Sequence, residues 1–170
     1  MALQEELSIN KSIKINRDSS YLFKIWRNPE YLPQILDFLE DVTALDENRS
    51  RWSVLIAKNE RVEWETEIVE EAYGKLIAWH SEDSPYVLHE GRVRFTENQR
   101  DNYTRVDLAL RFYFPLMEDS RSHMLGDDIA FRIEDDLYRF KLAVEGNEFP
   151  RIKDVRKGLP QQFPGKKFPH

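Results

Sequence analysis

The chain has 170 residues, of which 41% are hydrophobic and 33% are charged, and its formal net charge is −6. It contains no cysteine, which excludes disulfide bonds, thiolate metal sites and a cysteine nucleophile. No apolar run approaches the roughly 18 residues that a membrane span needs, and the N-terminus has no secretory pattern, so we expect a cytoplasmic protein without stable membrane insertion.

Charge is unevenly distributed along the chain. Residues 150–170 carry six basic residues and one acidic residue, whereas the rest of the chain is strongly acidic. An acidic body repels a phosphate backbone, so nucleic acid is not an expected partner. The chain also contains ten Phe, seven Tyr and four Trp residues, a composition that favours a large apolar interior or a pocket.

The first elements of the chain are predicted to be one strand and two short helices. Residues 7–15 alternate between apolar and polar side chains, which is typical of a half-buried strand. A cluster of Asn, Asp and Ser at 16–20 favours the start of a helix, and Pro29 ends that helix. Residues 29–37 predict a second short helix with Pro29 in its first turn.

The hydrophobic period changes to two after residue 39. This pattern predicts six strands, at 40–46, 50–57, 61–71, 75–82, 87–97 and 103–114. Short connections rich in turn-forming residues separate them, which indicates an antiparallel meander.

Residues 120–145 form the one long segment with a helical period. Its apolar residues make a continuous stripe: Leu125, Ile129, Ile133, Leu137, Phe140 and Val144. Gly146 is expected to end this helix. We expect residues 1–148 to form one domain and the basic, Pro/Gly-rich residues 149–170 to form an extended or disordered tail.

This order of elements predicts an α+β architecture. A seven-stranded antiparallel sheet must cover its apolar face, and the long C-terminal helix has the apolar stripe to do so. The sheet is expected to curl around this helix, with the two short helices after the first strand closing one end, in a helix-grip fold. The space between sheet and helix is then either packed core or a cavity.

Five segments carry a resemblance to the START-related superfamily of lipid-transfer and pollen-allergen-like domains. They are IWRNPEYLP at 25–33, SRW at 50–52, KLIAW at 75–79, GRVRF at 91–95 and DLYRFK at 136–141. Their order and spacing resemble the polyketide cyclase/dehydrase and coenzyme-Q-binding branch found in bacteria. The resemblance implies a helix-grip fold that binds a hydrophobic small molecule.

His80 and His89 flank a predicted hairpin turn at 83–85 and are the candidate catalytic residues. If the strand pairing centres on that turn, they are directly opposite, with Cβ atoms about 5 Å apart. Two imidazoles beside carboxylates could then move protons or hold a metal. A register shift of one residue would reverse the face of both side chains. We favour partly exposed, water-bonded histidines, and we predict no metal site and no cofactor.

Glu63, Glu65 and Glu67 alternate with apolar residues along one predicted strand. If Trp64 faces the helix, the three carboxylates form a solvated outer stripe, and this is the favoured interpretation. In the inverted register a glutamate would enter the interior, where burial would raise its pKa and suit it for acid–base catalysis.

Large apolar residues of the predicted strands and helices are the candidate ligand contacts. They are Trp26, Trp52, Trp64, Trp79, Phe95, Leu108, Phe112, Ile133 and Phe140. We expect the chain to bind or carry a lipid, an isoprenoid or quinone, or a polyketide-like compound, and a binding protein is favoured over an enzyme.

Two other functions remain open from the sequence. One is a cyclase or dehydratase that uses His80, His89 and a buried acid. The other is a non-catalytic interaction module. In that case residues 149–170 would contact a protein partner or a second copy, with Phe149, Phe163 and Phe168 as anchors.

Overall fold

A computed structural model of the chain describes residues 6–56, 60–81, 88–113 and 121–149. Its elements follow in the order β1 (Glu6–Ile15), α1 (Ser19–Arg27), η1 (Pro29–Tyr31), α2 (Leu32–Ile35), β2 (Leu39–Ala44), β3 (Arg49–Ile56), β4 (Glu60–Ala72), β5 (Leu76–Ser81), β6 (Leu88–Asn98), β7 (Tyr103–Tyr113) and α3 (Arg121–Glu145). The predicted strands and long helix are confirmed to within a few residues. The predicted helix at 29–37 divides into the 3-10 turn η1 and the short helix α2.

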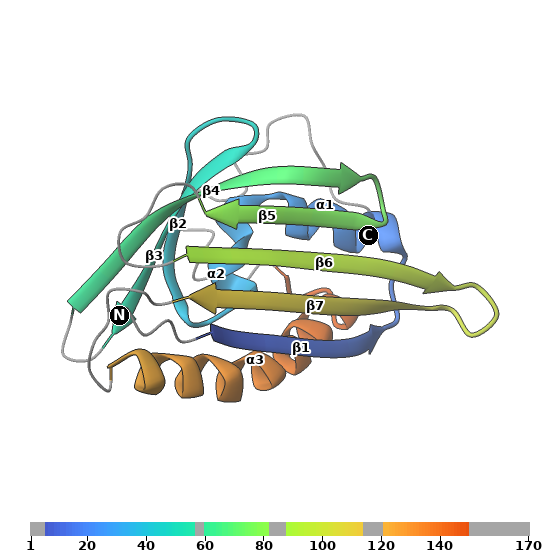
Figure 1. The fold of residues 1–170 in the computed structure, drawn as a ribbon. Coiled ribbons are helices and arrows are strands. Elements are labelled where there is room, and N and C mark those ends of the chain that lie inside the picture. The colour runs from blue at the N-terminus through green and yellow to red at the C-terminus, as the bar shows by residue number, and fades with distance from the viewer. Residues whose placement is uncertain (1–5, 57–59, 82–87, 114–120, 150–170) are drawn as a thin grey trace.

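The seven strands form one sheet in the order β1-β7-β6-β5-β4-β3-β2. Each of β2 to β7 pairs with its neighbour in sequence, and β1 closes the other edge by pairing antiparallel with β7. The sheet curls strongly, and the helices lie on its concave side (Figure 1). This is the helix-grip arrangement that the order of elements predicts.

Strict alternation sorts the strand residues between the two faces. On β7, Val106, Leu108, Leu110 and Phe112 are buried against the helices, whereas Arg111 between them is exposed. The inward residues of all strands and the apolar sides of the helices make one core cluster. Burial of such side chains stabilises the fold by about 25 cal/mol per Å² of apolar surface.

Helix α3 runs past the β1 edge of the sheet and reaches the short helices (Figure 1). Ile133, Leu137, Phe140 and Val144 of its predicted stripe are buried, while the side chains of Leu125 and Ile129 lie outside the described part. The ring of Phe140 meets Trp26 of α1 edge-on, with centroids 5.9 Å apart. The helix therefore packs against both the sheet and α1.

The C-terminus of α3 is closed by a hydrogen-bonded turn in which Asn147 is left-handed. Asn147 has a φ of 59°, its N–H donates to the carbonyl of Val144, and the next N–H, that of Glu148, donates to Ala143. This pattern is a Schellman motif. Gly146 directly follows the helix, as predicted, but the left-handed position falls on Asn147, whose amide side chain tolerates that conformation.

Phe149, the first residue of the predicted tail, packs on the body. Its ring centroid lies 5.3 Å from that of Tyr31 and 5.4 Å from that of Phe140. The remaining tail anchors predicted from sequence, Phe163 and Phe168, lie outside the described residues. In the described part of the chain, no helix combines the length and the apolar character needed to cross a bilayer.

Candidate functional site

The structure separates the two histidines that the sequence singled out. His80 is opposite Glu90 in the β5–β6 ladder, not opposite His89, so the predicted pairing is wrong by one residue. Side chains alternate between faces along a strand, so the shift places the two imidazoles on opposite sides of the sheet. The predicted turn at 83–85 lies outside the described residues.

His80 lies on the outer, solvent-facing side of the sheet. Its side chain is 48% exposed, and its Nε2 is 3.6 Å from a carboxylate oxygen of Glu67. It lines a surface depression of about 460 Å³, together with residues that include Glu90 and Arg92. Because His89 is buried on the other face, the two imidazoles cannot act on one substrate.

His89 lies on the concave face of the sheet, surrounded by aromatic rings. It is 3% exposed, and its ring stacks on Phe112 with centroids 4.4 Å apart. Centroids of Trp52, Trp64 and Trp79 lie 5.2, 5.8 and 6.3 Å from the imidazole. Four aromatic side chains therefore form a wall around it on the concave face, which we call the aromatic wall.

A hydrogen bond from Trp79 sets the tautomer of His89, and burial keeps the imidazole neutral. The indole Nε1 of Trp79 donates to His89 Nε2 at 2.9 Å. An imidazole nitrogen that accepts carries no proton, so the proton of neutral His89 is assigned to Nδ1. Burial lowers the pKa of His89 from 6.5 to about 3, and the main-chain carbonyl of Arg111 opposes this effect only in part. His89 is thus neutral at physiological pH.

Gly91 allows Trp79 to lie in this position. The two residues are directly opposite in the β5–β6 ladder, and the indole ring covers the backbone of Gly91. A Cβ at residue 91 would overlap the six-membered ring and would stand 2.7 Å from the indole nitrogen. Only glycine leaves room for this approach.

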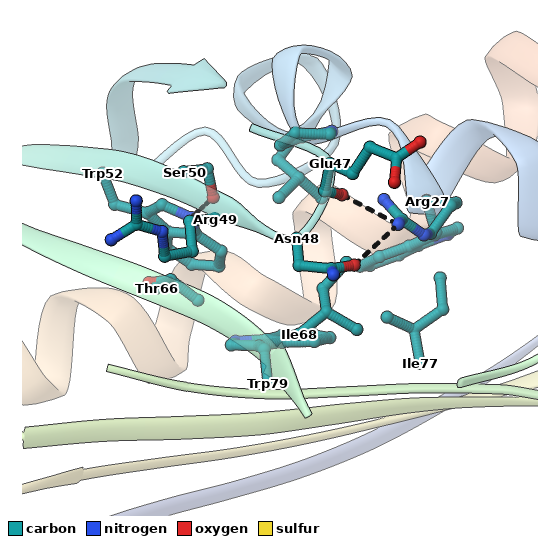
Figure 2. Close-up of a pocket in the computed structure, with 13 residues that line it drawn as sticks. Arg27, Glu47, Asn48, Arg49, Ser50, Trp52, Thr66, Ile68, Ile77 and Trp79 are labelled. Carbon is teal, nitrogen blue, oxygen red and sulfur yellow. Dashed lines mark hydrogen bonds between the residues drawn. The ribbon is translucent and has the colours of Figure 1, made fainter. Parts of the chain in front are cut away.

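A small cavity opens beside the aromatic wall, between α1 and the strands β3 to β5 (Figure 2). Its volume is about 30 Å³, which is space for about one water molecule. It is lined by Trp26, Arg27, Pro29, Leu32, Glu47, Asn48, Arg49, Ser50, Trp52, Thr66, Ile68, Ile77 and Trp79. As it stands, this cavity is too small for a whole lipid-sized molecule.

Hydrogen bonds from Arg27 of α1 connect the sides of this cavity. Its guanidinium donates to the main-chain carbonyl of Glu47 at 2.9 Å and to Asn48 Oδ1 at 3.4 Å (Figure 2). Its Nε also donates to the Glu71 carboxylate at 3.1 Å. One side chain of α1 thus holds the β2–β3 turn and the end of β4.

Several buried polar atoms in this region have no hydrogen-bond partner. They include the indole nitrogens of Trp26 and Trp64 and the hydroxyl of Thr66. By contrast, the indole of Trp52 donates to Ser50 Oγ at 2.9 Å, and that of Trp79 bonds His89. Most buried polar groups in proteins are hydrogen-bonded, so unpaired ones indicate strain or a missing partner.

The predicted ligand contacts are all buried, but they do not gather at one cavity. Trp26, Trp52 and Trp79 line it, whereas the other six are packed in the core, namely Trp64, Phe95, Leu108, Phe112, Ile133 and Phe140. Sequence reasoning did not select Thr66 or Ser50. Alternation could have found Thr66, because it shares a face with Trp64.

The three glutamates of β4 that the sequence singled out do not enter the interior. Glu63, Glu65 and Glu67 lie on the outer face, as favoured from the sequence, while Trp64 and Thr66 between them are buried. The interior-glutamate alternative is therefore wrong. Asp136 of α3 is a buried acid, and burial raises its pKa, but it accepts hydrogen bonds from the Asp37 N–H and from Arg139.

Comparison with known families finds one match. The family described as polyketide cyclase/dehydrase and lipid transport matches residues 15–143. Among curated proteins the chain has no match.

Several solved structures are similar to this one. A protein from Deinococcus radiodurans is 28% identical, with a TM-score of 0.67 over 82% of this chain and 98% of its own. A START superfamily protein from Mycobacterium smegmatis is 12% identical, with a TM-score of 0.64 over 81% and 99% of the two chains. Ginseng major latex-like protein 151 is 13% identical, with a TM-score of 0.54 over 81% and 98%.

Proposed function

Because this chain belongs to the polyketide cyclase/dehydrase and lipid transport family, within the START-related superfamily, we propose that it binds and carries a hydrophobic small molecule between the curled sheet and its helices. The candidate ligands are a lipid, an isoprenoid or quinone, and a polyketide-like compound.

The observation that carries this proposal is the aromatic wall with unpaired polar atoms beside it. A core selected only for stability would pair its buried indoles and hydroxyls. Here Trp64 and Thr66 lack partners next to an apolar surface that could cover a ligand. Transfer of such a ligand from water would contribute about 25 cal/mol for each Å² of apolar area buried.

The small size of the cavity means that binding requires movement. A volume of about 30 Å³ accepts one functional group, not a whole lipid. The segment from Trp26 to Leu36, which includes η1 and α2, is the lid in this proposal. Arg27 ties it to the β2–β3 turn, so release of these bonds would widen the opening.

A cyclase or dehydratase that uses the two histidines has less support. His80 and His89 face opposite sides of the sheet, and the buried acid Asp136 is held by Asp37 and Arg139. A role of residues 149–170 in contacting a protein partner or a second copy stays a separate prediction.

The first experiment looks for a ligand in the purified full-length chain. Organic extraction followed by mass spectrometry should recover a hydrophobic compound that is absent from a mock purification. Titration with N-phenyl-1-naphthylamine should also give saturable energy transfer from tryptophan to the bound probe. If no compound is recovered and the probe does not bind, the proposal is wrong.

Two neighbouring variants localise the binding. Ile68 lines the cavity, whereas Val69 points to the outer face and is 53% exposed. Ile68→Trp should fill the cavity and weaken probe binding about fivefold, since it covers apolar surface that contributes about 1 kcal/mol to binding. Val69→Trp adds the same ring outside and should leave binding unchanged. An equal loss in both variants would place the probe elsewhere.

A further inference from the structure

We propose that the outer face of the sheet has a separate site, which binds a small organic oxyanion, a carboxylate or a phosphate ester, at Arg92. The site is the surface depression of about 460 Å³ that spans neighbouring strands from β4 to β1 (Figure 1). The sheet lies between this depression and the aromatic wall, so the proposal does not depend on the hydrophobic ligand.

Small side chains and main-chain atoms form the floor of the depression. Ala78 of β5 and Ala109 of β7 are the two cross-strand partners of Arg92, so a methyl group flanks it on each side. Trp79 and Leu110 also line the depression, but their side chains are buried on the concave face, so they contribute main-chain atoms. The volume lies within the range of small-molecule sites, roughly 300–1,000 Å³.

The β4 side of the depression has an apolar rim. The register of β4 against β5 shifts between Ile68 and Glu70, which indicates a β-bulge at Val69. A bulge bends its strand, and here Val69 lines the depression with its side chain exposed. The exposed methyl groups of Val69 and the floor alanines favour a ligand with an apolar part.

Arg92 supplies a cation that no other group neutralises. Its side chain is exposed and lines the depression, and within the described residues it forms no hydrogen bond or ion pair. A guanidinium is a planar fork of donors that matches two oxygens of a carboxylate or a phosphate. Because both cross-strand partners are alanines, no larger side chain in that row blocks access to it.

The charges beside Arg92 favour an anion over a cation. Arg94, two residues along β6 on the same face, is exposed and likewise has no ion pair among the described residues. Arg111 also lines the depression, and its guanidinium is 2.7 Å from the Glu90 carboxylate, so those two charges offset each other. Arg92 and Arg94 therefore make this area positive, although the chain as a whole has a net charge of −6.

Glu70 limits the anionic group to one end of the ligand. It lines the depression on β4, opposite Ala78, which in turn is opposite Arg92. Two strand spacings separate the Glu70 and Arg92 backbones, about 10 Å. A carboxylate that binds Arg92 is therefore some distance from Glu70, whereas a second anionic group at the far end of the ligand would be repelled.

The test is an NMR titration of the ¹⁵N-labelled full chain with four benzene derivatives. Benzoate and phenyl phosphate carry an anionic group at one end, benzyl alcohol carries none, and terephthalate carries one at each end. At least one of the first two should shift the backbone amide signals of Ala78, Arg92 and Ala109. It should bind at least about tenfold more tightly than benzyl alcohol, as expected for a hydrogen bond to a charged group.

The order of the anions separates a built site from general attraction. Terephthalate should bind more weakly than benzoate, because Glu70 repels its second carboxylate. Non-specific attraction to a positive surface would give the reverse order and would count against the proposal. The tighter binder of benzoate and phenyl phosphate identifies whether the site prefers a carboxylate or a phosphate.

Two pairs of variants localise the binding. Arg92→Gln should weaken binding of the oxyanion at least about tenfold, whereas Arg100→Gln removes the same charge at the exposed turn after β6 and should leave binding unchanged. Ala109→Phe should fill the depression and abolish binding, whereas Thr96→Phe adds the same ring at an exposed position of β6 and should not. The amide spectrum of each variant shows whether it is folded.

Binding that survives Arg92→Gln, equal affinity for benzyl alcohol, or no amide shift with either benzoate or phenyl phosphate would overturn the proposal. None of these results affects the proposed carrier function, because that function is tested by organic extraction and by N-phenyl-1-naphthylamine.

Discussion

The indole ring of Trp79 covers the backbone of Gly91, its direct partner in the β5–β6 ladder, and from there donates its N–H to His89. The positions of Trp79 and His89 thus depend on the absence of a side chain at Gly91. This arrangement orients the imidazole and fills the centre of the aromatic wall.

Gly91→Ala should force Trp79 out of its position and break the bond to His89. Overpacking and loss of a buried hydrogen bond together should lower the free energy of unfolding by about 2–4 kcal/mol. Urea denaturation measures this change. In a Trp79→Phe background, where the smaller ring leaves more space, the cost of Gly91→Ala should fall. An undiminished cost there would show that the ring of Trp79 is not the obstacle.

His89 should make the protein less stable in mild acid. Its folded-state pKa of about 3 lies below its ordinary value of 6.5. As pH falls below 6.5 the unfolded chain takes up the proton first, so unfolding becomes easier by about 1.4 kcal/mol per pH unit until the folded pKa is reached. Above pH 6.5 His89 is mostly neutral in both the folded and the unfolded chain, so it no longer lowers the free energy of unfolding there.

His89→Phe should therefore reduce the loss of stability between pH 7 and pH 5 by about 2 kcal/mol, whatever its effect at pH 7. Urea unfolding at the two pH values provides the comparison. His80→Gln is the control, because that side chain is 48% exposed. If His89→Phe retains the full pH dependence of the wild type, the neutral buried state assigned to His89 is wrong.

Arg27→Ala should accelerate exchange of a bound hydrophobic probe. It removes the bonds from α1 to the Glu47 carbonyl, Asn48 and Glu71, which hold the cavity closed. Stopped-flow measurement with N-phenyl-1-naphthylamine should show both association and dissociation at least about fivefold faster, since each lost tie contributes about 1 kcal/mol. Arg105→Ala breaks a comparable ion pair with Asp107 outside the cavity and should not change the rates.

Arg17→Ala should loosen the C-terminus of α3. The Arg17 guanidinium donates to the carbonyl oxygen of Val144 at 2.8 and 2.6 Å and also bonds Asn147. Its removal leaves the last carbonyl groups of α3 without this cationic donor. We therefore expect the free energy of unfolding to fall by about 1–2 kcal/mol. Arg94→Ala, at an exposed position of β6, should change it by less than about 0.5 kcal/mol.

Much of the fold could be predicted because the relevant signals are local. Alternation along residues 103–114 fixed which side chains of that strand face inward, and the stripe from Ile133 to Val144 fixed the buried side of the long helix. Alternation along β4 likewise separated Glu65 from Trp64 and favoured Trp64 as the inward residue, as the structure has it. Each of these patterns depends on neighbours within a few residues, so the sequence contains it directly.

Tertiary structure decided the details of the candidate site. The β5–β6 register differs by one residue from the symmetric hairpin, and this separates His80 from His89. The register satisfies a packing condition, because Trp79 must lie opposite the one residue on β6 that has no side chain. The unpaired indole of Trp26 and the volume of the cavity depend on how α1 meets β3 to β5, a long-range arrangement that no local pattern of residues encodes.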